Sequence, residues 1–534
     1  MPSRRRRLFV LAPAVVLAMW AAFQVGHVTR HDLGATPDSA IYLGTADNLR
    51  HGHGPTVPFT FLWDDYSPRE AVRHRAHIWS SHFPPAYPAS LAAASIVGGD
   101  SRGAARGVDI VCVALNVVLV GVLTARMTKY RSVIVATIAP AVMLFVVDAV
   151  PVPLGGVGWF GSHISIASEP LFAALFTAAL IVTGAAITAE GRQANLALAG
   201  AAAMAAGTLL TRYNGIAVVM TVAIALVWFD RARPLPERLR RSAIFATAAT
   251  APIVLFVLVV AANGGGGARV FAYHNLGGVT RGSLRLIGAS IVPATWPEAA
   301  HIATTLVLLA VTVIAATWLP HVEGFWQRDH QGTVLLRCCL LSIPIYIFVI
   351  WFARTFLDHG VNVAPRYFVG LRGIWTAVFV AACYRVVSTY VAPVAVSVAL
   401  AVAVTLVAHS DWTFTRLWWR TLPARTTSTV EQTIAALPRQ TLLATSVPER
   451  IYLTTKRSSV LLPSRTVYLT GNTNDSFGRQ VDEYVGLLRS HAAYVLWVPP
   501  FDPIVTPEEL GRRLDLRVVA RGGDETLYRV VSSP

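Results

Sequence analysis

Between Thr36 and Gly54 the sequence reads TPDSAIYLGTADNLRHGHG, directly after the first apolar segment of the chain. Thr36 is a suitable N-cap, Pro37 suits the first position of a helix, and Gly52 suits its exit. The stretch therefore predicts a short helix that follows closely on the apolar segment.

This predicted helix presents a carboxylate beside an aromatic ring. With about 3.6 residues per turn, Asp38 and Tyr42 fall on one face, and Asp47 falls on roughly the opposite side. The first face also carries Ile41, Thr45 and Leu49. Asp38 has two interpretations at this stage: it either complements the helix dipole in the first turn, or it is a functional carboxylate beside an apolar segment.

The composition excludes an ordinary soluble protein. Of 534 residues 54% are hydrophobic and only 14% are charged, and the mean hydropathy is +0.53. The chain is therefore predicted to be a polytopic α-helical membrane protein with about eleven transmembrane helices. The predicted spans are 8–28, 103–126, 132–150, 166–189, 194–211, 213–229, 242–262, 300–319, 334–353, 371–388 and 391–408.

The net charge of +16 is concentrated in short loops on one side of the predicted membrane. The clusters are Arg4–Arg7, Arg126–Arg131 and Arg231–Arg241, and such loops face the cytoplasm. A multi-pass protein of the plasma membrane with a cytoplasmic N-terminus is therefore predicted, with the Asp38 helix on the outer side. Nucleic acid is not expected as a partner, because the sequence has no contiguous soluble basic domain.

Two regions follow from this pattern. Residues 1–409 form the predicted transmembrane domain, in which 29–102 is a first extracytoplasmic loop built of surface helices. Charges return in residues 410–534, which predict a small α/β domain, and an odd number of spans places it outside. Its predicted strands are 440–446, 458–462, 494–498 and 516–520, and its predicted helices are 431–437, 482–490 and 507–514.

The four cysteines fall in or beside the predicted spans. They offer no disulfide framework outside the membrane, and the adjacent pair lacks the spacing of a zinc site. The sequence therefore predicts no metal site from its cysteines, which are Cys112, Cys338, Cys339 and Cys383.

Ionisable side chains at the edges of apolar segments are costly, so each one is a candidate for function. Glu169 opens a span, and its alternative role is that of a favourable anion at a helix N-terminus. His82 is either a hydrogen-bonded structural residue or a functional one, acting as a ligand or a base. Arg212 and Arg366 are predicted on the outer side, whereas basic residues of membrane proteins prefer the cytoplasmic side. Their unusual position favours a functional role.

A base and two cations of this kind suit one reaction class. A carboxylate deprotonates a hydroxyl group, and guanidinium groups stabilise a departing phosphate. The side chains predicted to form such a site are Asp38, Glu169, Arg212 and Arg366, if the fold brings them together.

Five motifs, in this order, resemble those of the polyprenyl-phosphate-dependent membrane glycosyltransferases of the GT-C fold. The nearest branch is the protein-mannosyltransferase and lipid A aminoarabinose-transferase group. Each motif alone is weak, and the resemblance lies in their order and spacing over the whole membrane region. The motifs are Asp38-Ser39 with Tyr42-Leu43, His82 to Pro88, Ser168 to Phe172, Thr211 to Gly215, and Pro365-Arg366-Tyr367.

The resemblance implies transfer of one sugar from a polyprenyl-phosphate donor to a hydroxyl of an acceptor glycan, lipid or protein at the outer membrane face. By this analogy Asp38 is the general base, Arg212 and Arg366 handle the carrier phosphate, and Glu169 lines the sugar pocket. The remaining residues expected to bind substrate are Tyr42, His82, Tyr213 and Tyr367.

One departure from the family pattern leaves a divalent metal open. Some relatives have two adjacent acidic residues where this chain has Asp38 and Ser39, and the adjacent Asp64 and Asp65 lie too far along the loop to be equated with them. The alternative function is a transporter or flippase of a lipid-linked saccharide. Such proteins show internal repeats and discontinuous helices, and the sequence gives no sign of either. A third possibility is a scaffold protein that has kept the fold and lost the activity.

Overall fold

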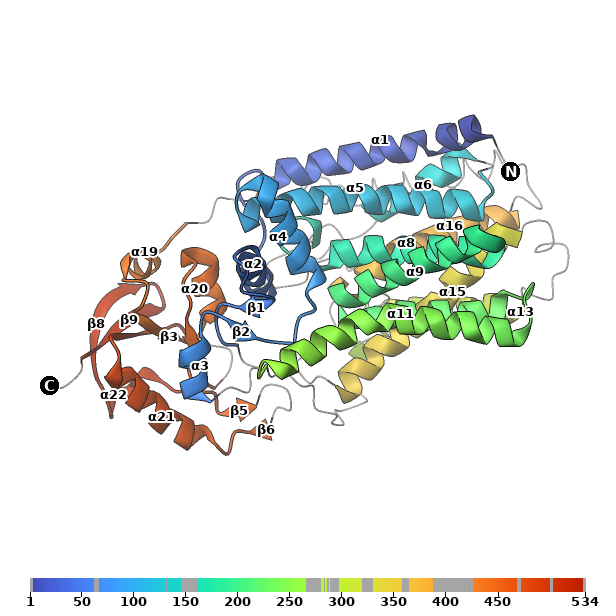
Figure 1. Cartoon of the computed structure of the whole chain (residues 1–534). Helices are drawn as coiled ribbons and strands as arrows, with labels where there is room; N and C mark the ends of the chain where they lie inside the picture. The colour runs from blue at the N-terminus through green and yellow to red at the C-terminus, as the bar shows by residue number, and fades with distance from the viewer. Residues whose placement is uncertain are drawn as a thin grey trace.

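The helices of the bundle run side by side, and an α/β domain formed by the C-terminal part of the chain lies at one end of them in the computed structural model (Figure 1). The N-terminus lies at the other end of the bundle. The structure describes residues 3–61, 67–130, 132–145, 162–265, 280–282, 284–285, 288, 297–318, 330–357, 365–387, 422, 426–467, 472–499 and 503–531.

Seven helices in the described ranges are long and apolar enough to cross a bilayer. They are α1 (Arg4–Val28), α5 (Ser101–Met127), α8 (Glu169–Thr188), α9 (Gly191–Thr211), α11 (Leu235–Ala262), α15 (His330–Phe356) and α16 (Val369–Val387). Further apolar helices are α4 (Ala86–Gly98), α6 (Val133–Phe145), α10 (Ile216–Phe229) and α13 (Glu298–Trp318). The prediction of a polytopic helical membrane protein is confirmed. The expected span 391–408 lies outside the described residues, so the total of eleven stays a prediction.

The bundle is apolar on its outside and tightly packed within. Large apolar side chains such as Phe23 and Leu258 are more than half exposed, at 65% and 61%, as expected of a surface that faces lipid. Inside, Gly370 of α16 lies so close to Phe172 of α8 that an added Cβ would come within 2.6 Å of the ring. Small residues therefore set the separation of these two helices.

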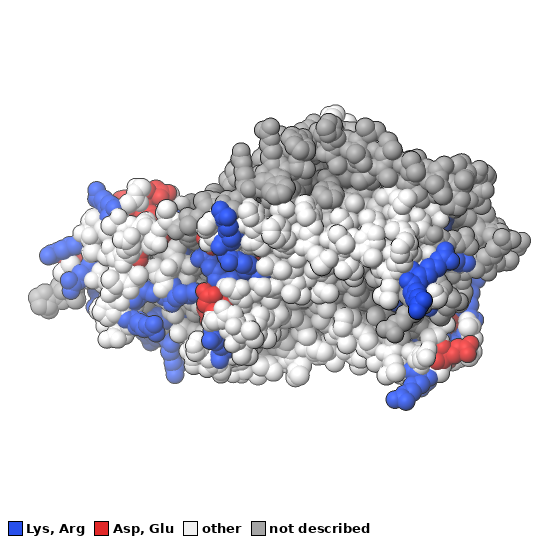
Figure 2. Space-filling model, turned by 90° about the horizontal axis from the view of Figure 1, so that it is seen from above, with Lys and Arg blue, Asp and Glu red and all other residues white. Residues whose placement is uncertain are grey.

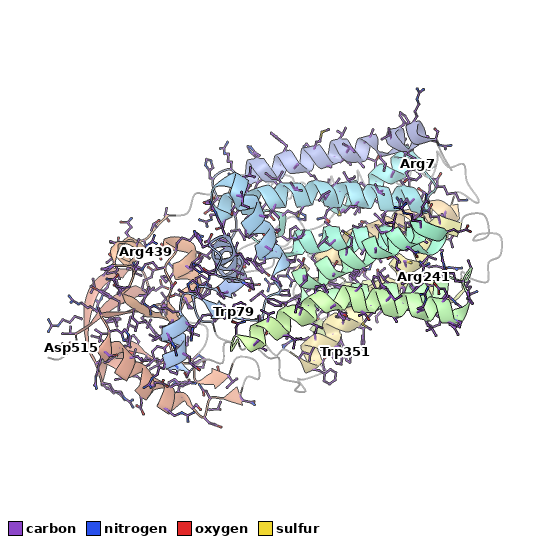
Figure 3. The ribbon with its side chains drawn as sticks, in the orientation of Figure 1. Arg7, Trp79, Arg241, Trp351, Arg439 and Asp515 are labelled. Atoms are coloured by element: carbon purple, nitrogen blue, oxygen red, sulfur yellow. The ribbon has the colours of Figure 1, made fainter. Side chains whose placement is uncertain are left out.

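Charged side chains gather at both ends of the bundle, and Figure 2 shows uncharged residues on the surface between them. Arg7 and Arg241 lie at the end away from the C-terminal domain, whose Arg439 and Asp515 mark the opposite extreme of the molecule (Figure 3). This arrangement is the one expected of a protein that crosses a membrane between its two charged ends.

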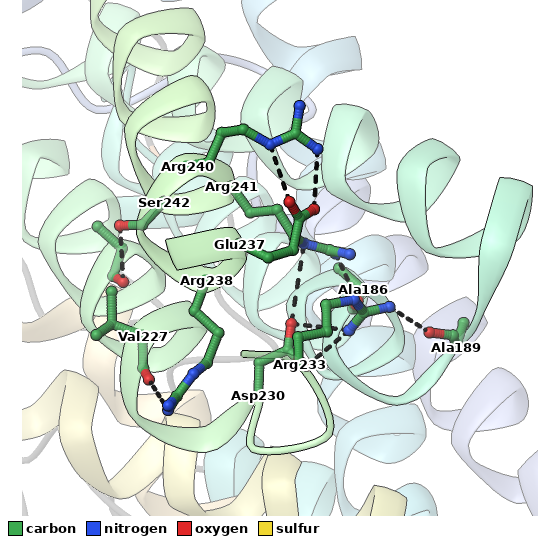
Figure 4. Close-up of polar contacts among 11 residues, drawn as sticks. Ala186, Ala189, Val227, Asp230, Arg233, Glu237, Arg238, Arg240, Arg241 and Ser242 are labelled. Carbon is green, nitrogen blue, oxygen red and sulfur yellow. Dashed lines mark hydrogen bonds and ion pairs between the residues drawn. The ribbon is translucent and has the colours of Figure 1, made fainter. Parts of the chain in front are cut away.

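At the end of the bundle where Arg241 lies, a set of residues that we name the Asp230 cluster ties three helices together (Figure 4). Arg233 donates to both carboxylate oxygens of the fully buried Asp230, at 2.6 and 2.8 Å, and Nε of Arg241 lies 3.8 Å from Oδ2. The same arginines also donate to backbone carbonyl oxygens, Arg233 to Ala189 at 3.0 Å and Arg241 to Ala186 at 2.9 Å. The charges are thus closed off within the protein.

The predicted helix at Thr36 is confirmed as α2 (Pro37–Arg50). Thr36 is its N-cap and Pro37 its first residue, and the chain leaves the helix through Gly52, whose φ of +79° suits a residue without Cβ. Burial is not confined to the face of Asp38 and Tyr42, because Ser39, Ala40 and other residues around the helix are also buried. The reason is tertiary: α2 is enclosed by α4, α5 and the C-terminal domain.

The C-terminal domain is a five-stranded sheet between two layers of helices, with strand order β4-β3-β7-β9-β8. The strands are β3 (Leu442–Thr445), β4 (Val460–Leu461), β7 (Ala493–Trp497), β8 (Asp515–Gly522) and β9 (Glu525–Val531). The first three are parallel, and β9 runs antiparallel to both β7 and β8. The predicted α/β domain is confirmed, although the sequence interpretation missed β9.

Side chains alternate between the two faces of this sheet. Leu443 packs in one apolar core with α19 (Thr429–Ala436) and α20 (Pro448–Thr455), whereas Leu442 and Ala444 pack in the other core with α21 (Phe477–Ser490) and α22 (Pro507–Gly511). The sequence interpretation also missed α20. A separate pair of short strands, β5 (Thr466–Val467) and β6 (Asn472–Thr473), is antiparallel.

The segment between α1 and α5 is built into the C-terminal domain. This segment contains two short paired strands, β1 (Thr56–Val57) and β2 (Ile78–Trp79). Just after β1, Phe59 forms a parallel bridge with Ser459, beside the edge strand β4. Leu461 N donates to Thr60 Oγ1 at 2.6 Å, which continues this contact. Helix α3 (Pro68–His74) adds apolar side chains to the core that contains α21, and Figure 1 shows α3, in blue, among the orange and red elements.

A second contact joins the domain to the C-terminal half of α2. Asp47 accepts hydrogen bonds from Tyr452 Oη at 2.6 Å and from Lys456 Nζ at 2.9 Å. Burial raises the pKa of the Asp47 carboxyl, but the Lys456 charge and these hydrogen bonds outweigh it, and the net pKa is lowered. Helix α2 therefore connects the C-terminal domain to the end of the membrane bundle.

Candidate active site

Four helix ends meet where the membrane bundle faces the C-terminal domain. Asp38 stands in the first turn of α2, Glu169 is the first residue of α8, and Arg212 follows the last residue of α9. Arg366 belongs to the 3-10 helix η3 (Pro365–Phe368), which leads into α16. Residues far apart in the sequence thus approach each other, because these helices end at the same level of the bundle.

A tight turn holds Arg212 in place. The chain passes from α9 through the 3-10 helix η1 (Tyr213–Gly215) directly into α10. A Cβ added at Gly215 would lie only 2.7 Å from the backbone of Leu209 and Thr208, so a residue without a side chain is required there. The motif Thr-Arg-Tyr-Asn-Gly therefore sets the position of its arginine through its glycine.

The four side chains form a network of ion pairs that we name the Asp38 cluster. Arg366 Nη1 lies 3.0 Å from Asp38 Oδ2, and Arg212 Nη1 lies 2.7 Å from Glu169 Oε1. Arg366 Nε is 4.0 Å from the same Glu169 oxygen, which links the two pairs. The Asp38 side chain is 20% exposed and that of Glu169 only 5%, so Asp38 is the carboxylate that is open to an incoming molecule.

Hydroxyl groups fix α2 against α8 beside this cluster. Tyr42 Oη and Ser168 Oγ are 3.0 Å apart, and Arg212 Nη1 donates to the same Ser168 oxygen at 3.0 Å. Ser39 Oγ donates to the backbone oxygen of Ile166 at 2.7 Å. Burial raises the pKa of the Tyr42 hydroxyl well above its usual range, so Tyr42 acts here as a neutral hydrogen-bonding group.

An aromatic ring lies against both arginines. The guanidinium carbons of Arg212 and Arg366 are 5.3 and 5.5 Å from the centre of the Tyr367 ring, within the range of a cation–π contact. Tyr346 Oη donates to the backbone oxygen of Tyr367 at 2.5 Å and accepts from Asn214 Nδ2 at 2.7 Å. These contacts fix the segment that carries Arg366.

A cavity of about 430 Å³ opens on the Asp38 cluster. Its polar end contains Asp38, Arg212 and Arg366, and its other walls contain apolar side chains such as Phe348 of α15 and Met220 of α10. The volume lies within the range of ligand-binding pockets, and the lining suits a molecule with an anionic head and an apolar chain. The predicted residues that line this cavity are Asp38, Tyr42, His82, Arg212, Tyr213, Arg366 and Tyr367.

Glu169 is placed differently from the other predicted residues. It lines a smaller adjoining pocket with Asp38, Tyr42 and Arg366, rather than the main cavity, and its side chain is almost entirely buried. It lies behind the arginines and neutralises them. The positions are thus known for all eight predicted residues, whereas their roles stay predictions.

The segment around His82 forms part of the cavity wall. The buried His82 ring packs edge-on against Phe83, with ring centres 5.0 Å apart, and Tyr213 Oη donates to the backbone oxygen of Ser81. The Phe83 ring is in turn 5.4 Å from that of Tyr42. His82 therefore belongs to an aromatic group in the wall of the cavity.

Sequence reasoning missed several members of the site. Ser168 was part of a quoted motif, but its bridging position between Tyr42 and Arg212 depends on the approach of α2 to α8. Tyr346 lies inside an apolar span, and its hydroxyl group was the only feature of the sequence that could have pointed to a role in the site.

Metal binding remains a separate matter. Within the residues that the structure describes, no group of three or more His, Cys, Asp and Glu side chains is arranged to hold a metal ion. Asp64 and Asp65 lie outside those residues. The metal dependence left open by the sequence therefore stays a prediction.

The sequence matches no family model and no curated protein, but the fold matches solved structures. ArnT from Cupriavidus metallidurans bound to undecaprenyl phosphate matches with a TM-score of 0.54 and 12% identity, over 99% of this chain and 99% of that chain. The apo state of ArnT matches with a TM-score of 0.52 and 14% identity, over 97% of each chain. The Archaeoglobus fulgidus oligosaccharyltransferase has a TM-score of 0.49 and 12% identity, over 91% of this chain and 68% of that chain. The chain therefore has the fold of ArnT, which is the GT-C fold that the order of its motifs predicts.

Proposed function

We propose that this protein is a membrane glycosyltransferase that moves a sugar from a polyprenyl-phosphate donor to an acceptor hydroxyl, with Asp38 as general base. The observation that carries the proposal is the pairing of Asp38 with Arg366 at the polar end of an otherwise apolar cavity. The fold is that of ArnT, which has been solved with undecaprenyl phosphate, a ligand of the same chemical class as the proposed donor.

The cavity has the two surfaces that such a donor needs. Arg212 and Arg366 offer N–H groups to the phosphate, and an arginine has five donors, of which the ion pairs use only some. Phe348, Phe352 and Leu357 line the apolar part, against which a polyprenyl chain can pack. We therefore place the phosphate at the arginines, the chain along α15 and the sugar toward Asp38.

The proposed step is a displacement at the anomeric carbon. The acceptor hydroxyl loses its proton to Asp38 while its oxygen forms a bond to that carbon. The bond between the anomeric carbon and the phosphate oxygen breaks, and the electron pair leaves with the polyprenyl phosphate. One proton is thus transferred to the carboxylate, one carbon–oxygen bond forms and one breaks.

The pairing of Asp38 with Arg366 couples the proton to the leaving group. The two carboxylates and two arginines of the Asp38 cluster balance each other in formal charge. When Asp38 takes the proton it becomes neutral, and the charge of Arg366 is no longer balanced. This happens as the departing phosphate gains negative charge, so the base and the anion-binding group act together.

The proposal includes the orientation of the chain in the membrane. We place the N-terminus in the cytoplasm and the C-terminal domain outside the plasma membrane, because Arg7 and Arg241 lie at the bundle end away from that domain (Figure 3). The acceptor, whether a glycan, a lipid or a protein, then meets the donor at the outer face, with membrane lipids around the bundle.

A transfer assay tests the proposal. The purified chain is reconstituted in liposomes with undecaprenyl-phosphate-linked mannose or arabinose, and bond formation to an added acceptor is measured together with the release of undecaprenyl phosphate. Transfer that is lost in Asp38→Asn supports the proposal. Movement of the lipid-linked sugar across the bilayer with no bond made would instead indicate a flippase. Repeating the assay with EDTA tests whether a divalent cation contributes.

A further inference from the structure

A second cavity, of about 370 Å³, lies where the first outer loop meets the C-terminal domain. It shares no lining residue with the cavity at Asp38. The outer loop contributes residues around Thr60 and Phe61, and the domain contributes the segment after β4 and the start of α21. Such a junction between two parts of a fold is a common place for a ligand.

More than half of the described side chains that line this seam cavity are polar, and one of them is charged. Side-chain hydroxyl and amide groups come from Ser464, Thr466, Thr473, Asn474, Ser476 and Gln480. In the part of the chain described, Asp475 is the only lining residue with a formal charge, and it is exposed and has no ion-pair partner there. The seam cavity thus differs from the Asp38 cavity, which contains two arginines.

Hydrogen bonds fix the orientation of the amide groups. Asn474 Nδ2 donates to Ser464 O at 2.7 Å and to Gln480 Oε1 at 2.9 Å, and Asn474 Oδ1 accepts from Ser476 N at 3.1 Å. The Gln480 oxygen is therefore engaged, and its Nε2 has no hydrogen-bond partner among the described residues. A donor at Gln480 and an acceptor at Asp475 are left for a ligand.

Aromatic side chains complete the wall. Phe61 and Tyr484 line the cavity, and Tyr484 Oη donates to the backbone oxygen of Leu461, so that the phenol is held in one position. Two arginines adjacent in sequence to lining residues already have partners: Arg465 pairs with Glu509 and lies over the Phe477 ring at 4.3 Å, and Arg479 Nη2 donates to Ser476 Oγ at 3.0 Å. The chemistry of this wall favours a ligand with many hydroxyl groups and an apolar face over a phosphate.

We propose that the seam cavity binds a sugar residue of an oligosaccharide, and that this saccharide is the part of the acceptor that lies away from the reacting hydroxyl. Each sugar hydroxyl both donates and accepts, which matches the acceptor at Asp475 and the donor at Gln480, while its C–H face packs on the rings. The identification of the saccharide as acceptor rests on the proposed glycosyltransferase function; the binding itself does not. Binding energy from such a remote contact helps to orient the reacting group.

The test measures saccharide binding to the full-length protein in detergent by saturation-transfer NMR, with mannohexaose, arabinohexaose and maltohexaose as probes. We expect at least one of these to bind, and Asp475→Asn and Gln480→Ala each to weaken it about tenfold, because Asp475→Asn replaces one charged acceptor oxygen with an amide donor and Gln480→Ala removes the donor. Asp524→Asn is the matched control, since Asp524 is exposed in the turn between β8 and β9 and does not line the cavity. It is expected to bind like the wild type.

The outcomes separate the two proposals. Asp38→Asn is expected to keep saccharide binding while it loses transfer, so a failure of the glycosyltransferase function leaves the binding result intact. Binding by none of the hexasaccharides, or equal binding by wild type, Asp475→Asn and Gln480→Ala, would overturn the assignment. So would a serine- and threonine-containing heptapeptide that binds in their place with the same dependence on Asp475.

Discussion

The Asp38 cluster and the Asp230 cluster contain similar groups and lie at opposite ends of the bundle, but they differ in how far the protein encloses their charges. In the Asp230 cluster both arginines also donate to backbone carbonyls of α8 or of the residue that follows it, and the carboxylate is 0% exposed. In the Asp38 cluster the carboxylate is 20% exposed and opens, with its arginine, on a cavity. A closed cluster holds helices together, whereas an open one is available to a ligand.

The comparison shows why charge near a membrane does not by itself identify a site. Both clusters carry buried ion pairs, and a buried pair is weak support for either stability or function until its surroundings are known. What separates them is whether the carboxylate is enclosed by the protein, as Asp230 is, or opens on a cavity together with its arginine, as Asp38 does. The four predictions below test this difference.

The largest effect is expected from Asp38→Asn. Loss of the proposed general base should lower the rate of sugar transfer by about 10²–10⁴-fold, with little change in the unfolding temperature. The rate of transfer and the thermal unfolding of the purified variant are measured side by side. Near-normal transfer by this variant would remove Asp38 from the role of base.

Asp230→Asn should show the reverse pattern. Two buried arginines lose their counter-charge, so the free energy of unfolding should fall by about 3–5 kcal/mol, while transfer per folded molecule stays near the wild-type value. Thermal unfolding in detergent reports the first quantity, and the transfer assay the second. A folded variant that is inactive would contradict the distinction between the clusters.

Arg366→Lys keeps the charge but loses the planar arrangement of donors. We expect a loss of about 10²-fold in transfer, because a lysine cannot bind phosphate through two parallel hydrogen bonds. The matched control is Arg233→Lys in the Asp230 cluster, which should affect stability more than rate. Equal rate losses in both variants would mean that the effect is a general one of buried arginines.

The smallest effect is expected from Tyr42→Phe. It removes the hydrogen bond to Ser168, which also holds Arg212, and transfer should fall by about fivefold. The control is Tyr87→Phe: the Tyr87 ring packs at 5.0 Å from that of Tyr42, but its hydroxyl has no hydrogen-bond partner among the described residues. The control should transfer at the wild-type rate, and a similar loss in both would assign the effect to packing.

Local features of the sequence predicted much of the fold. The cap at Thr36, the proline after it and the glycine exit predicted α2 because each acts only on the residues next to it in the chain. The membrane class followed from the lengths of the apolar runs. The strand β9 and the helix α20 were missed, because short elements of mixed composition acquire their identity from the sheet against which they pack.

The candidate site was predictable as a set of residues but not as an arrangement. Each of its charged groups stands at a helix end, where charge beside an apolar run is visible in the sequence. Which arginine meets which carboxylate was not visible. Nor was it visible that Glu169 would line a smaller pocket beside the main cavity, with a side chain only 5% exposed.

The sequence by itself determined that the chain crosses a membrane, that it ends in an α/β domain and that its unusual charges stand at the ends of helices, because all three depend on composition and short-range periodicity. Tertiary structure alone decided that Arg366 meets Asp38 across 328 positions, and that the segment between α1 and α5 joins the C-terminal domain. Pairings of that kind depend on how helices of fixed length pack against one another, and no local pattern encodes them.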